Sequence, residues 1–445
     1  MKIRKLHLKN IGVFDDQEIV FQPCKAKDKA EIHIFTGQNG SGKTTILETL
    51  TSVFHELPLN SALYKRFRDF ENEGTKHFTL TGNDTFLSTI KVNLDSHELF
   101  ELRGNRRFKN SITNDINSYR NIGVYRQLIK ATSKPDSELE FAAFAFSGSQ
   151  QVKGKPVEAI YEPKDFNPLS QSLEFVKDYS QPNQISINQL IANNFSKRWI
   201  ESSRDRKKSE KFKQVLLTIE QTISEITGWQ IEFDLQTEPL NLIAKINGED
   251  LDFDVLPDGL RSLISWMADL LGRVDLLKWQ DNLPINEKNL ILFLDEIEVH
   301  LHPAWQRKVL PVVQKLFKNS QIFISTHSPF VINSVDDAWV YKLELENGKA
   351  RVADVVLSED GLSYQTVLRE IFGIDKRFGG EAQNKLDDFY RQRDSLLKAN
   401  GKGKLKKKDF LKLAKDLASQ SAELQSLVFL ELARLSKETG EPYEI

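Results

Sequence analysis

Hydrophobic residues recur along this chain with two different periods, and their succession predicts an α/β fold. Short apolar runs predict β-strands at residues 3–8, 17–21, 31–35, 78–82, 88–94 and 139–148. The 3.6-residue period of amphipathic helices marks residues 44–54, 256–277 and 303–318. The run NLILFLDE at 289–296 is apolar up to its two final acids, which is typical of a buried parallel strand, and a further strand is predicted at 321–326.

Changes in this pattern divide the chain into four parts. We expect an N-terminal lobe at 1–151, an inserted helical lobe at 152–255, a C-terminal lobe at 256–360 and a helical tail at 361–445. The inserted lobe is predicted to be mostly helical over 165–225 and to end in a hairpin around Asn247-Gly248.

The tail is predicted to contain helices at 362–397 and 405–437, with a flexible linker at 399–408 between them. An apolar stripe along the last helix includes Phe410, Leu413, Leu417, Leu424, Val428 and Leu435. Such a stripe either packs against the protein's own core or docks onto a partner.

Composition excludes several classes of protein. The 445 residues are 40% hydrophobic and 28% charged, as in ordinary globular proteins, and a net charge of −2 gives no overall basic field for nucleic acid. The single cysteine, Cys24, rules out a disulfide framework within the chain and a four-cysteine zinc site. No apolar run approaches the ~20 residues that cross a bilayer, and no signal peptide is evident, so we expect a cytoplasmic protein without a membrane partner.

A glycine-rich segment, GQNGSGKT at 37–44, joins a predicted strand to a predicted helix. It matches the P-loop pattern G-x-x-x-x-G-K-[ST] in full, and strand–loop–helix is the context which that pattern requires. Its N–H groups would face the phosphates of ATP, Lys43 would reach the β- and γ-phosphates, and the Thr44 hydroxyl would bind Mg²⁺. The predicted nucleotide-binding residues here are Gly37, Gln38, Asn39, Gly40, Ser41, Gly42, Lys43, Thr44 and Thr45.

Two acids and a histidine at strand ends are the candidates for catalysis. Asp295 ends a buried strand and would hold Mg²⁺ through water, while the adjacent Glu296 is the natural general base for the attacking water. His327 lies in STHSPF, directly after the strand at 321–326, where it would donate to the γ-phosphate and help to place the water.

The segment LPDGLRSL at 256–263 opens a helix before the acidic strand. In this order the motifs resemble the ABC-ATPase superfamily, and in particular its SMC, RecF and OLD-type branch, to which the run DEIEVHLHP is similar. The resemblance implies an ABC-ATPase head whose sites are completed by dimerisation, because the signature loop caps the γ-phosphate bound by the other subunit. Gly259 matches the signature glycine.

This signature segment departs from the family pattern at two positions. Pro257 replaces the usual serine, and Leu260 replaces the usual glutamine or glutamate. Asp258, Arg261 or Ser262 would then have to contact the phosphate instead, and hydrolysis is expected to be slow or gated by a partner.

The resemblance also implies a Mg²⁺-sensing glutamine after the last strand of the N-terminal lobe, a position that fits Gln150 and Gln151 equally. It places a turn that contacts the other subunit after the acids, although Glu298, His300 and His302 there also have a spacing that suits a metal. Basic clusters offer possible DNA contacts at 103–109, 204–213 and 402–408, with a solvated face or linker as the commoner explanation.

Within the superfamily, the segments around these motifs look most like the ATPase subunit of Septu-type antiphage defence systems (PtuA-like). The resemblance implies a homodimer or higher homo-oligomer that partners an HNH nuclease. Three alternatives stay open: a PARIS-type defence ATPase that holds a toxin nuclease, a RecF- or SMC-like DNA-repair ATPase, and an ATP-sensing scaffold that hardly hydrolyses ATP. An SMC protein would carry hundreds of heptad residues, and an OLD-type protein would append an acid-rich nuclease domain; this sequence has neither.

Overall fold

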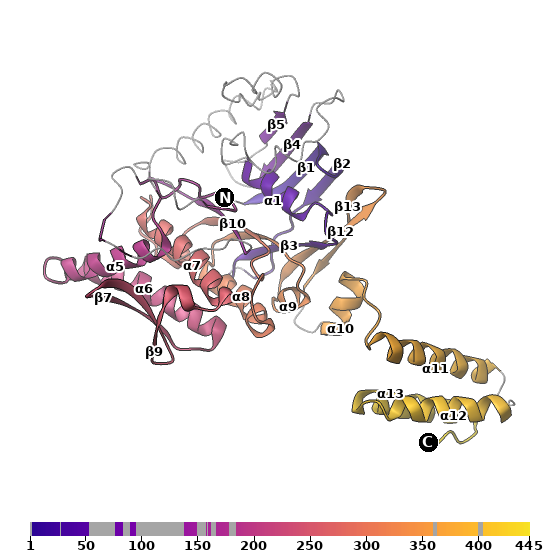
Figure 1. The fold of residues 1–445 in the computed structure, drawn as a ribbon. Coiled ribbons are helices and arrows are strands. Elements are labelled where there is room, and N and C mark those ends of the chain that lie inside the picture. The colour runs from indigo at the N-terminus through magenta and orange to yellow at the C-terminus, as the bar shows by residue number, and fades with distance from the viewer. Residues whose placement is uncertain are drawn as a thin grey trace. The chain divides into compact units, whose positions relative to one another are not determined.

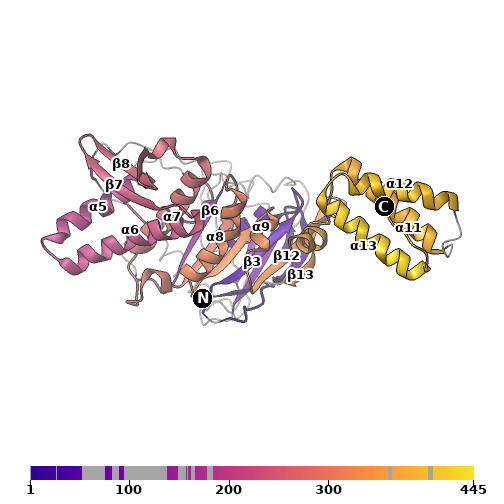
Figure 2. The same ribbon diagram turned by 90° about the horizontal axis from the view of Figure 1, so that it is seen from below.

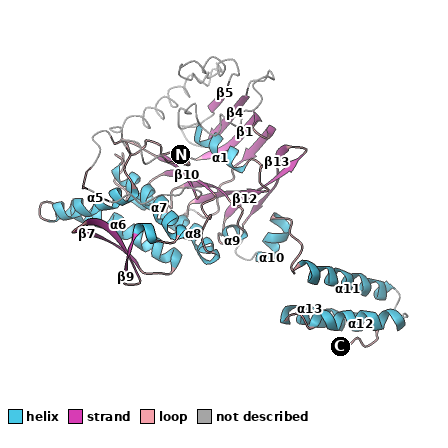
Figure 3. Cartoon of the chain, viewed as in Figure 1, coloured by secondary structure: helices cyan, strands magenta, loops and turns pink. Residues whose placement is uncertain are grey.

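The structure is a computed structural model that describes residues 2–26, 28–52, 76–82, 90–94, 138–148, 157, 159–161, 166–177, 184–358, 363–398 and 404–445. The chain forms two compact units, Met1–Val367 and Leu368–Ile445. Among the described residues, no helix has both the length and the apolar character that crossing a membrane requires. Helices and strands are distinguished by colour in Figure 3.

A six-stranded, mostly parallel sheet forms the centre of the first unit (Figure 1). Its strands, in spatial order, are β13 (Lys349–Leu357), β12 (Ala338–Glu346), β3 (Glu31–Gly37), β11 (Gln321–Ser325), β10 (Leu290–Asp295) and β6 (Ala142–Ser147). Only β13 runs antiparallel to its neighbour. The α/β fold class predicted from the sequence is therefore confirmed.

The central strands are buried on both faces, which explains their continuous apolar sequences. One face, which includes Phe35, Ile291 and Phe323, packs against α1 (Lys43–Ser52) and a second sheet. That antiparallel sheet has the order β2 (Phe14–Val20), β1 (Ile3–Ile11), β4 (Lys76–Gly82) and β5 (Ile90–Leu94). The opposite face is covered by α7 (Asp258–Leu276), since its Trp266 ring lies 6.1 Å from Phe146 of β6.

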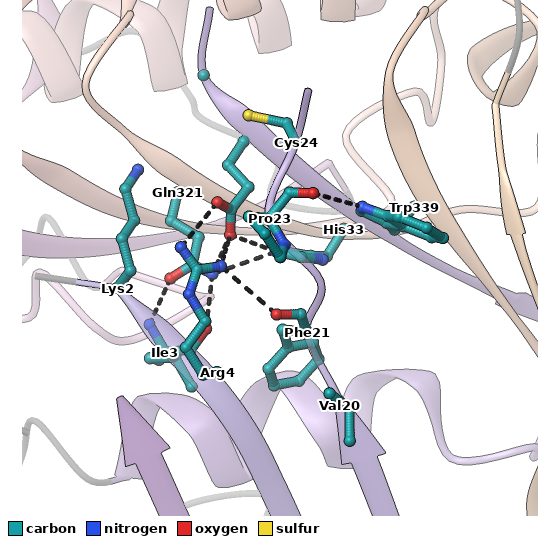
Figure 4. A network of polar contacts seen from close by, with 12 residues as sticks. Lys2, Ile3, Arg4, Val20, Phe21, Pro23, Cys24, His33, Gln321 and Trp339 are labelled. Atoms are coloured by element: carbon teal, nitrogen blue, oxygen red, sulfur yellow. Dashed lines mark hydrogen bonds and ion pairs between the residues drawn. The ribbon is translucent and has the colours of Figure 1, made fainter. Parts of the chain in front are cut away.

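A buried polar network fastens the two sheets together at the amino ends of β3 and β11 (Figure 4). Gln321 exchanges two hydrogen bonds with the backbone of Ile3, at 2.7 and 2.8 Å, and Arg4 forms an ion pair with Glu31. Although burial opposes it, hydrogen bonds from His33 and Arg4 lower the pKa of Glu31 to about 2. This network lies at the end of the parallel strands opposite the predicted site, so its role is to hold the sheets in register.

Residues 187–252 form a helical hairpin followed by a small antiparallel sheet (Figure 2). The helices are α5 (Ile187–Ser202) and α6 (Arg206–Thr227), and the strands are β7 (Ile231–Thr237), β8 (Leu240–Ile246) and β9 (Glu249–Asp252). The predicted turn at Asn247-Gly248 is confirmed, with φ of +51° and +89°. The prediction of helix from residue 165 is wrong, because residues 166–177 form turns and loop.

Arg273 of α7 explains why residues 166–177 need no helix. Its buried guanidinium donates to the carbonyl oxygens of Pro168 and Ser170, at 2.8 and 2.7 Å, and pairs with Asp269. A side chain from another element therefore satisfies the backbone of this segment.

The second unit is a bundle of three helices, α11 (Gly380–Lys398), α12 (Lys404–Ala418) and α13 (Ala422–Thr439). The prediction of a single helix over 405–437 is wrong, because α12 ends at Ala418 and a new helix begins at Ala422. Ser421 caps α13 by accepting from Leu424 N–H. The helix α12 begins at Lys404, inside the linker predicted at 399–408, so that prediction is wrong from residue 404 onward. Most of the apolar stripe, including Phe410, Leu417 and Val428, is buried inside this bundle.

Candidate functional site

The glycine-rich loop after β3 is shaped by close approaches that exclude side chains. A Cβ atom on Gly37 would lie 2.3 Å from the carbonyl oxygen of Leu343, and one on Gly42 would lie 2.5 Å from the ring of Phe14. Both residues have positive φ, as does Gly40. Phe14 is buried against the loop, so it is a core residue and not an exposed ring on which the adenine of ATP could stack.

The polar side chains of this loop have different environments. Lys43 donates from Nζ to the carbonyl oxygens of Gly37 and Gln38, both at 3.1 Å. Burial lowers the pKa of Lys43, and the carboxylates of Glu296, Asp295 and Glu298 offset part of this effect. Ser41 Oγ is buried and has no hydrogen-bond partner among the described residues. Gln38 and Asn39 are exposed, whereas Thr45 is buried in the first turn of α1.

Thr44 and Asp295 meet because β10 and β3 flank β11 in the sheet. The Thr44 hydroxyl lies 3.2 and 3.3 Å from the two carboxylate oxygens of Asp295. Ser325, which is beside Asp295 in the strand register, donates its hydroxyl to the same carboxylate. Hydroxyl and carboxylate oxygens are the ligands that Mg²⁺ prefers, so these residues fit that ion together with phosphate oxygens. No cluster of three or more His, Cys, Asp or Glu side chains with metal-binding geometry occurs among the described residues.

Glu296 and His327 lie next to each other, directly after β10 and shortly after β11. Glu296 has a φ of +50°, a left-handed conformation that turns the chain directly after β10. Its Oε1 lies 3.5 Å from His327 Nε2, and the two side chains are 35% and 36% exposed. Burial and the Lys43 charge lower the pKa of His327, which favours its neutral imidazole, although Asp295 opposes this effect.

The predicted signature segment begins α7 and packs on the loop after β10. Gly259 has no room for a side chain, because a Cβ atom there would lie 2.4 Å from the carbonyl oxygen of His300. Asp258 and Arg261 form an ion pair with each other, and Arg261 also donates to the carbonyl oxygen of Asp254 at 3.2 Å. Pro257 precedes the helix and supplies no side-chain cap.

Two other predictions meet different outcomes. Gln150 and Gln151 lie outside the described residues. His302 caps α8 (Pro303–Leu316) through Nδ1, which accepts from Ala304 N–H at 3.2 Å, so this histidine has a structural role.

Sequence reasoning missed the role of the buried Glu298 and the half-buried Gln306. Glu298 binds the loop that carries His327, and Gln306 bonds to both loops at this edge of the sheet. The only signal in the sequence was a glutamate close after the acids, which by itself does not show what it contacts.

A P-loop, a strand-end acid pair and a strand-end histidine on a mostly parallel sheet define the class of P-loop ATP-binding domains. The family model described as "AAA domain, putative AbiEii toxin, Type IV TA system" matches residues 32–333, and the chain belongs to this family. The AAA domain that defines this family implies that the chain binds ATP.

Curated relatives are similar over different shares of the chain. The retron Vc95 probable ATPase of Vibrio cholerae is 24% identical over 74% of this chain and 72% of its own length. The retron Ec83 probable ATPase of Escherichia coli is 30% identical, over 40% of this chain and only 32% of that protein. The Septu protein PtuA of Bacillus thuringiensis is 22% identical over 32% of this chain and 37% of its own. The sequence motifs had suggested the Septu likeness but not the retron one.

Among solved structures, an SMC head bound to the C-terminal winged-helix domain of ScpA is 15% identical with a TM-score of 0.45, over 80% of this chain and 98% of that one.

Proposed function

We propose that this chain is an ATPase that binds ATP with Mg²⁺ and hydrolyses it at the site described above. The observation that supports this is the gathering of Lys43, Thr44, Asp295, Glu296 and His327 at the carboxyl ends of adjacent strands. Relatives named probable ATPases support it further.

Each residue has a distinct role in this proposal. The loop N–H groups and Lys43 bind the phosphates, while Thr44 and Asp295 hold Mg²⁺, which neutralises charge on the phosphates. Glu296 takes the proton of the attacking water. His327 orients that water and the γ-phosphate by hydrogen bonding, and its contact with Glu296 keeps the two groups on the same side of the site.

A homodimer formed around ATP is part of the same proposal. The amino end of α7, with Asp258, Gly259 and Arg261, would cap the γ-phosphate bound by the other subunit, as in the ABC resemblance. The Asp258 carboxylate has the same sign of charge as the phosphate, so this residue would contact it only through its backbone N–H, whereas the paired Arg261 has further N–H groups to donate. Because the Asp258 charge weakens the attraction of Arg261 for the phosphate, this pair supports slow or partner-gated hydrolysis.

The biological setting that we propose is antiphage defence. Relatives named as retron ATPases and as Septu PtuA support it, and the Septu resemblance implies an HNH nuclease as the partner controlled in trans. A PARIS-type toxin nuclease is the alternative partner. The gene beside this one distinguishes the two, since it would encode either an HNH protein or a TOPRIM toxin.

The test is phosphate release by the full chain with Mg²⁺ and ATP. Glu296→Gln should keep ATP bound, reduce turnover by roughly 10²–10⁴-fold and trap an ATP-dependent dimer in light scattering. The matched control for Glu296→Gln is Glu249→Gln, the same change on an exposed strand. Lys43→Ala should lose binding of a fluorescent ATP analogue. Turnover by Glu296→Gln at the wild-type rate would place the base elsewhere. If the wild type binds ATP without releasing phosphate, the chain is the ATP-sensing scaffold.

A second candidate function, DNA binding, is favoured by the α5–α6 hairpin. The hairpin brings Lys197 and Arg198 beside the cluster at 204–213, since Ser209 donates to the carbonyl oxygen of Arg198 at 3.0 Å. Lys207 and Lys208 lie in the first turn of α6, where the helix dipole disfavours cations, so helix stability does not explain them. Trp199 nearby is 46% exposed.

Charge reversal tests this second candidate. Wild-type affinity for a labelled DNA duplex should fall steeply with salt, and Arg204→Glu combined with Lys207→Glu and Lys208→Glu should abolish binding. A triple reversal of Lys412 and Lys415 on α12 and Lys437 on α13, at exposed positions outside the basic clusters, is the control. Equal affinity of the hairpin variant and the wild type would leave this cluster a solvated face.

A further inference from the structure

Glu298 is a buried acid that joins the loops after β10 and β11. It lies three residues beyond Asp295 and is 6% exposed. Its Oε1 accepts from the Thr326 hydroxyl at 2.5 Å and from the His327 N–H at 3.0 Å. Its Oε2 is buried and has no hydrogen-bond partner among the described residues. The carboxyl group therefore binds the segment that carries His327 with one oxygen.

Gln306 of α8 makes a second connection between the same two loops. Its amide nitrogen donates to the carbonyl oxygens of Glu298 and Leu301, at 3.2 and 3.0 Å. Its amide oxygen accepts from the Ser328 hydroxyl at 2.6 Å. The buried Glu298 and the half-buried Gln306 thus hold residues 326–328 against residues 298–301, with His327 between the points of attachment.

Burying a carboxyl group with one unpaired oxygen is unfavourable, and the desolvation raises the pKa of Glu298 to about 7. An apolar side chain of the same size would fill this space without that penalty. Only an acceptor, however, can hold the Thr326 hydroxyl and the His327 N–H at once. The contacts of Glu298 therefore indicate a geometric role and not a contribution to stability.

We propose that Glu298 is a positioning residue that fixes His327 for ATP hydrolysis. It touches neither the P-loop residues nor the Asp295 carboxylate in any described hydrogen bond, and it acts by holding the backbone from which the imidazole projects toward Glu296. This inference rests on the proposed ATPase function.

The experiment is a mutant cycle on turnover by the full chain. Glu298→Leu keeps the volume and removes the acceptor, so kcat should fall at least about tenfold while the affinity for a fluorescent ATP analogue stays at the wild-type value. Glu298→Gln keeps an acceptor oxygen and should restore most of the rate. His327→Ala should be at least as slow as Glu298→Leu, and the double variant should be no slower than His327→Ala alone.

Each other outcome has a definite meaning. A wild type without turnover contradicts the proposed function, whereas a wild type with turnover and an equally fast Glu298→Leu overturns only this inference. Fold losses that multiply in the double variant would also overturn it, since Glu298 would then act independently of His327. If Glu298→Leu does not fold, Gln306→Leu removes the second connection and is taken through the same cycle with the same expectation.

Discussion

Gly259 stands in the first turn of α7, where a side chain has no room. A Cβ atom would lie 2.4 Å from the carbonyl oxygen of His300, and moving this backbone group aside would cost considerable free energy. Part of the reason for a glycine at this signature position is therefore packing within one chain. The contact joins the start of α7 to the loop that begins with Glu296, so a shift of either element moves the other.

Gly259→Ala should lower both stability and turnover. The new methyl group has to displace the 296–301 loop or α7, and overpacking of this kind typically costs about 1–3 kcal/mol. Gly380→Ala is the control, because a Cβ atom there meets nothing within 4 Å. Thermal melts and phosphate release on both variants measure the effect, and equal melting temperatures would show that the loop yields freely.

Glu298→Gln should stabilise the protein at high pH. Burial raises the pKa of Glu298 from 4.5 to about 7, so the folded state favours the protonated form. Preferential protonation of Glu298 in the folded state therefore contributes fully to the free energy of unfolding below pH 4.5. This contribution is lost as the pH rises through about 7. The neutral amide avoids the loss, so the advantage of the variant in urea unfolding should be up to about 3 kcal/mol at pH 8 and should shrink toward pH 5. An advantage that does not change with pH would contradict the buried-acid explanation.

At the scale of elements, local pattern predicted most of the sheet and the main site residues. The strands β3, β10 and β11 have continuous apolar sequences that end in the P-loop, the acids and the histidine, and parallel strands bring such ends to one edge. Contacts between distant segments could not be read in this way. Glu298 and Gln306 act only because β10 and β11 are neighbours, and Arg273 supports a segment about a hundred residues away.

Strand β7 was not predicted, although the local pattern of its own residues indicates a strand. Its residues Ile231, Phe233 and Leu235 alternate with exposed or half-buried polar residues, so the signal was present in the sequence. The neighbouring Ser224 and Glu220 of α6 accept from Ile231 and Phe233 N–H, at 3.1 and 2.8 Å, and protect this edge of the small sheet.

Arg273→Met should destabilise the first unit strongly. It leaves the buried Asp269 with only the more distant Lys177 ammonium, 3.9 Å away, and removes the donors of the Pro168 and Ser170 carbonyl groups. Breaking a buried pair in this way costs about 3–5 kcal/mol. Arg307→Met, at an exposed position of α8, is the matched control. Urea midpoints of the two variants should differ clearly, and equal midpoints would mean that the buried arginine adds little to the stability.

At the scale of the whole molecule, the chain contains two units with separate cores. The core of the second unit is formed by all three of its helices, with Phe389 of α11 stacked on Phe410 of α12 at 4.9 Å between ring centroids. The apolar stripe of the tail is therefore used mainly within the unit. Phe429 and Leu430 of α13 are 46% and 69% exposed, so they are the large apolar residues of this helix that the bundle does not bury.

The position of a truncation should decide whether the remaining protein behaves well. A chain that ends at Val367 loses the bundle as a whole, and it should bind a fluorescent ATP analogue with wild-type affinity and stay soluble. A chain that ends at Ala399 keeps α11 without α12 and α13, which leaves Leu386, Phe389 and Leu396 without their partners. Because such exposed apolar faces associate, this longer chain should aggregate and melt earlier. The isolated segment 368–445 should be helical and unfold cooperatively in circular dichroism. If instead the chain ending at Val367 aggregates while the one ending at Ala399 does not, α11 belongs energetically to the first unit, and the boundary has to be moved beyond it.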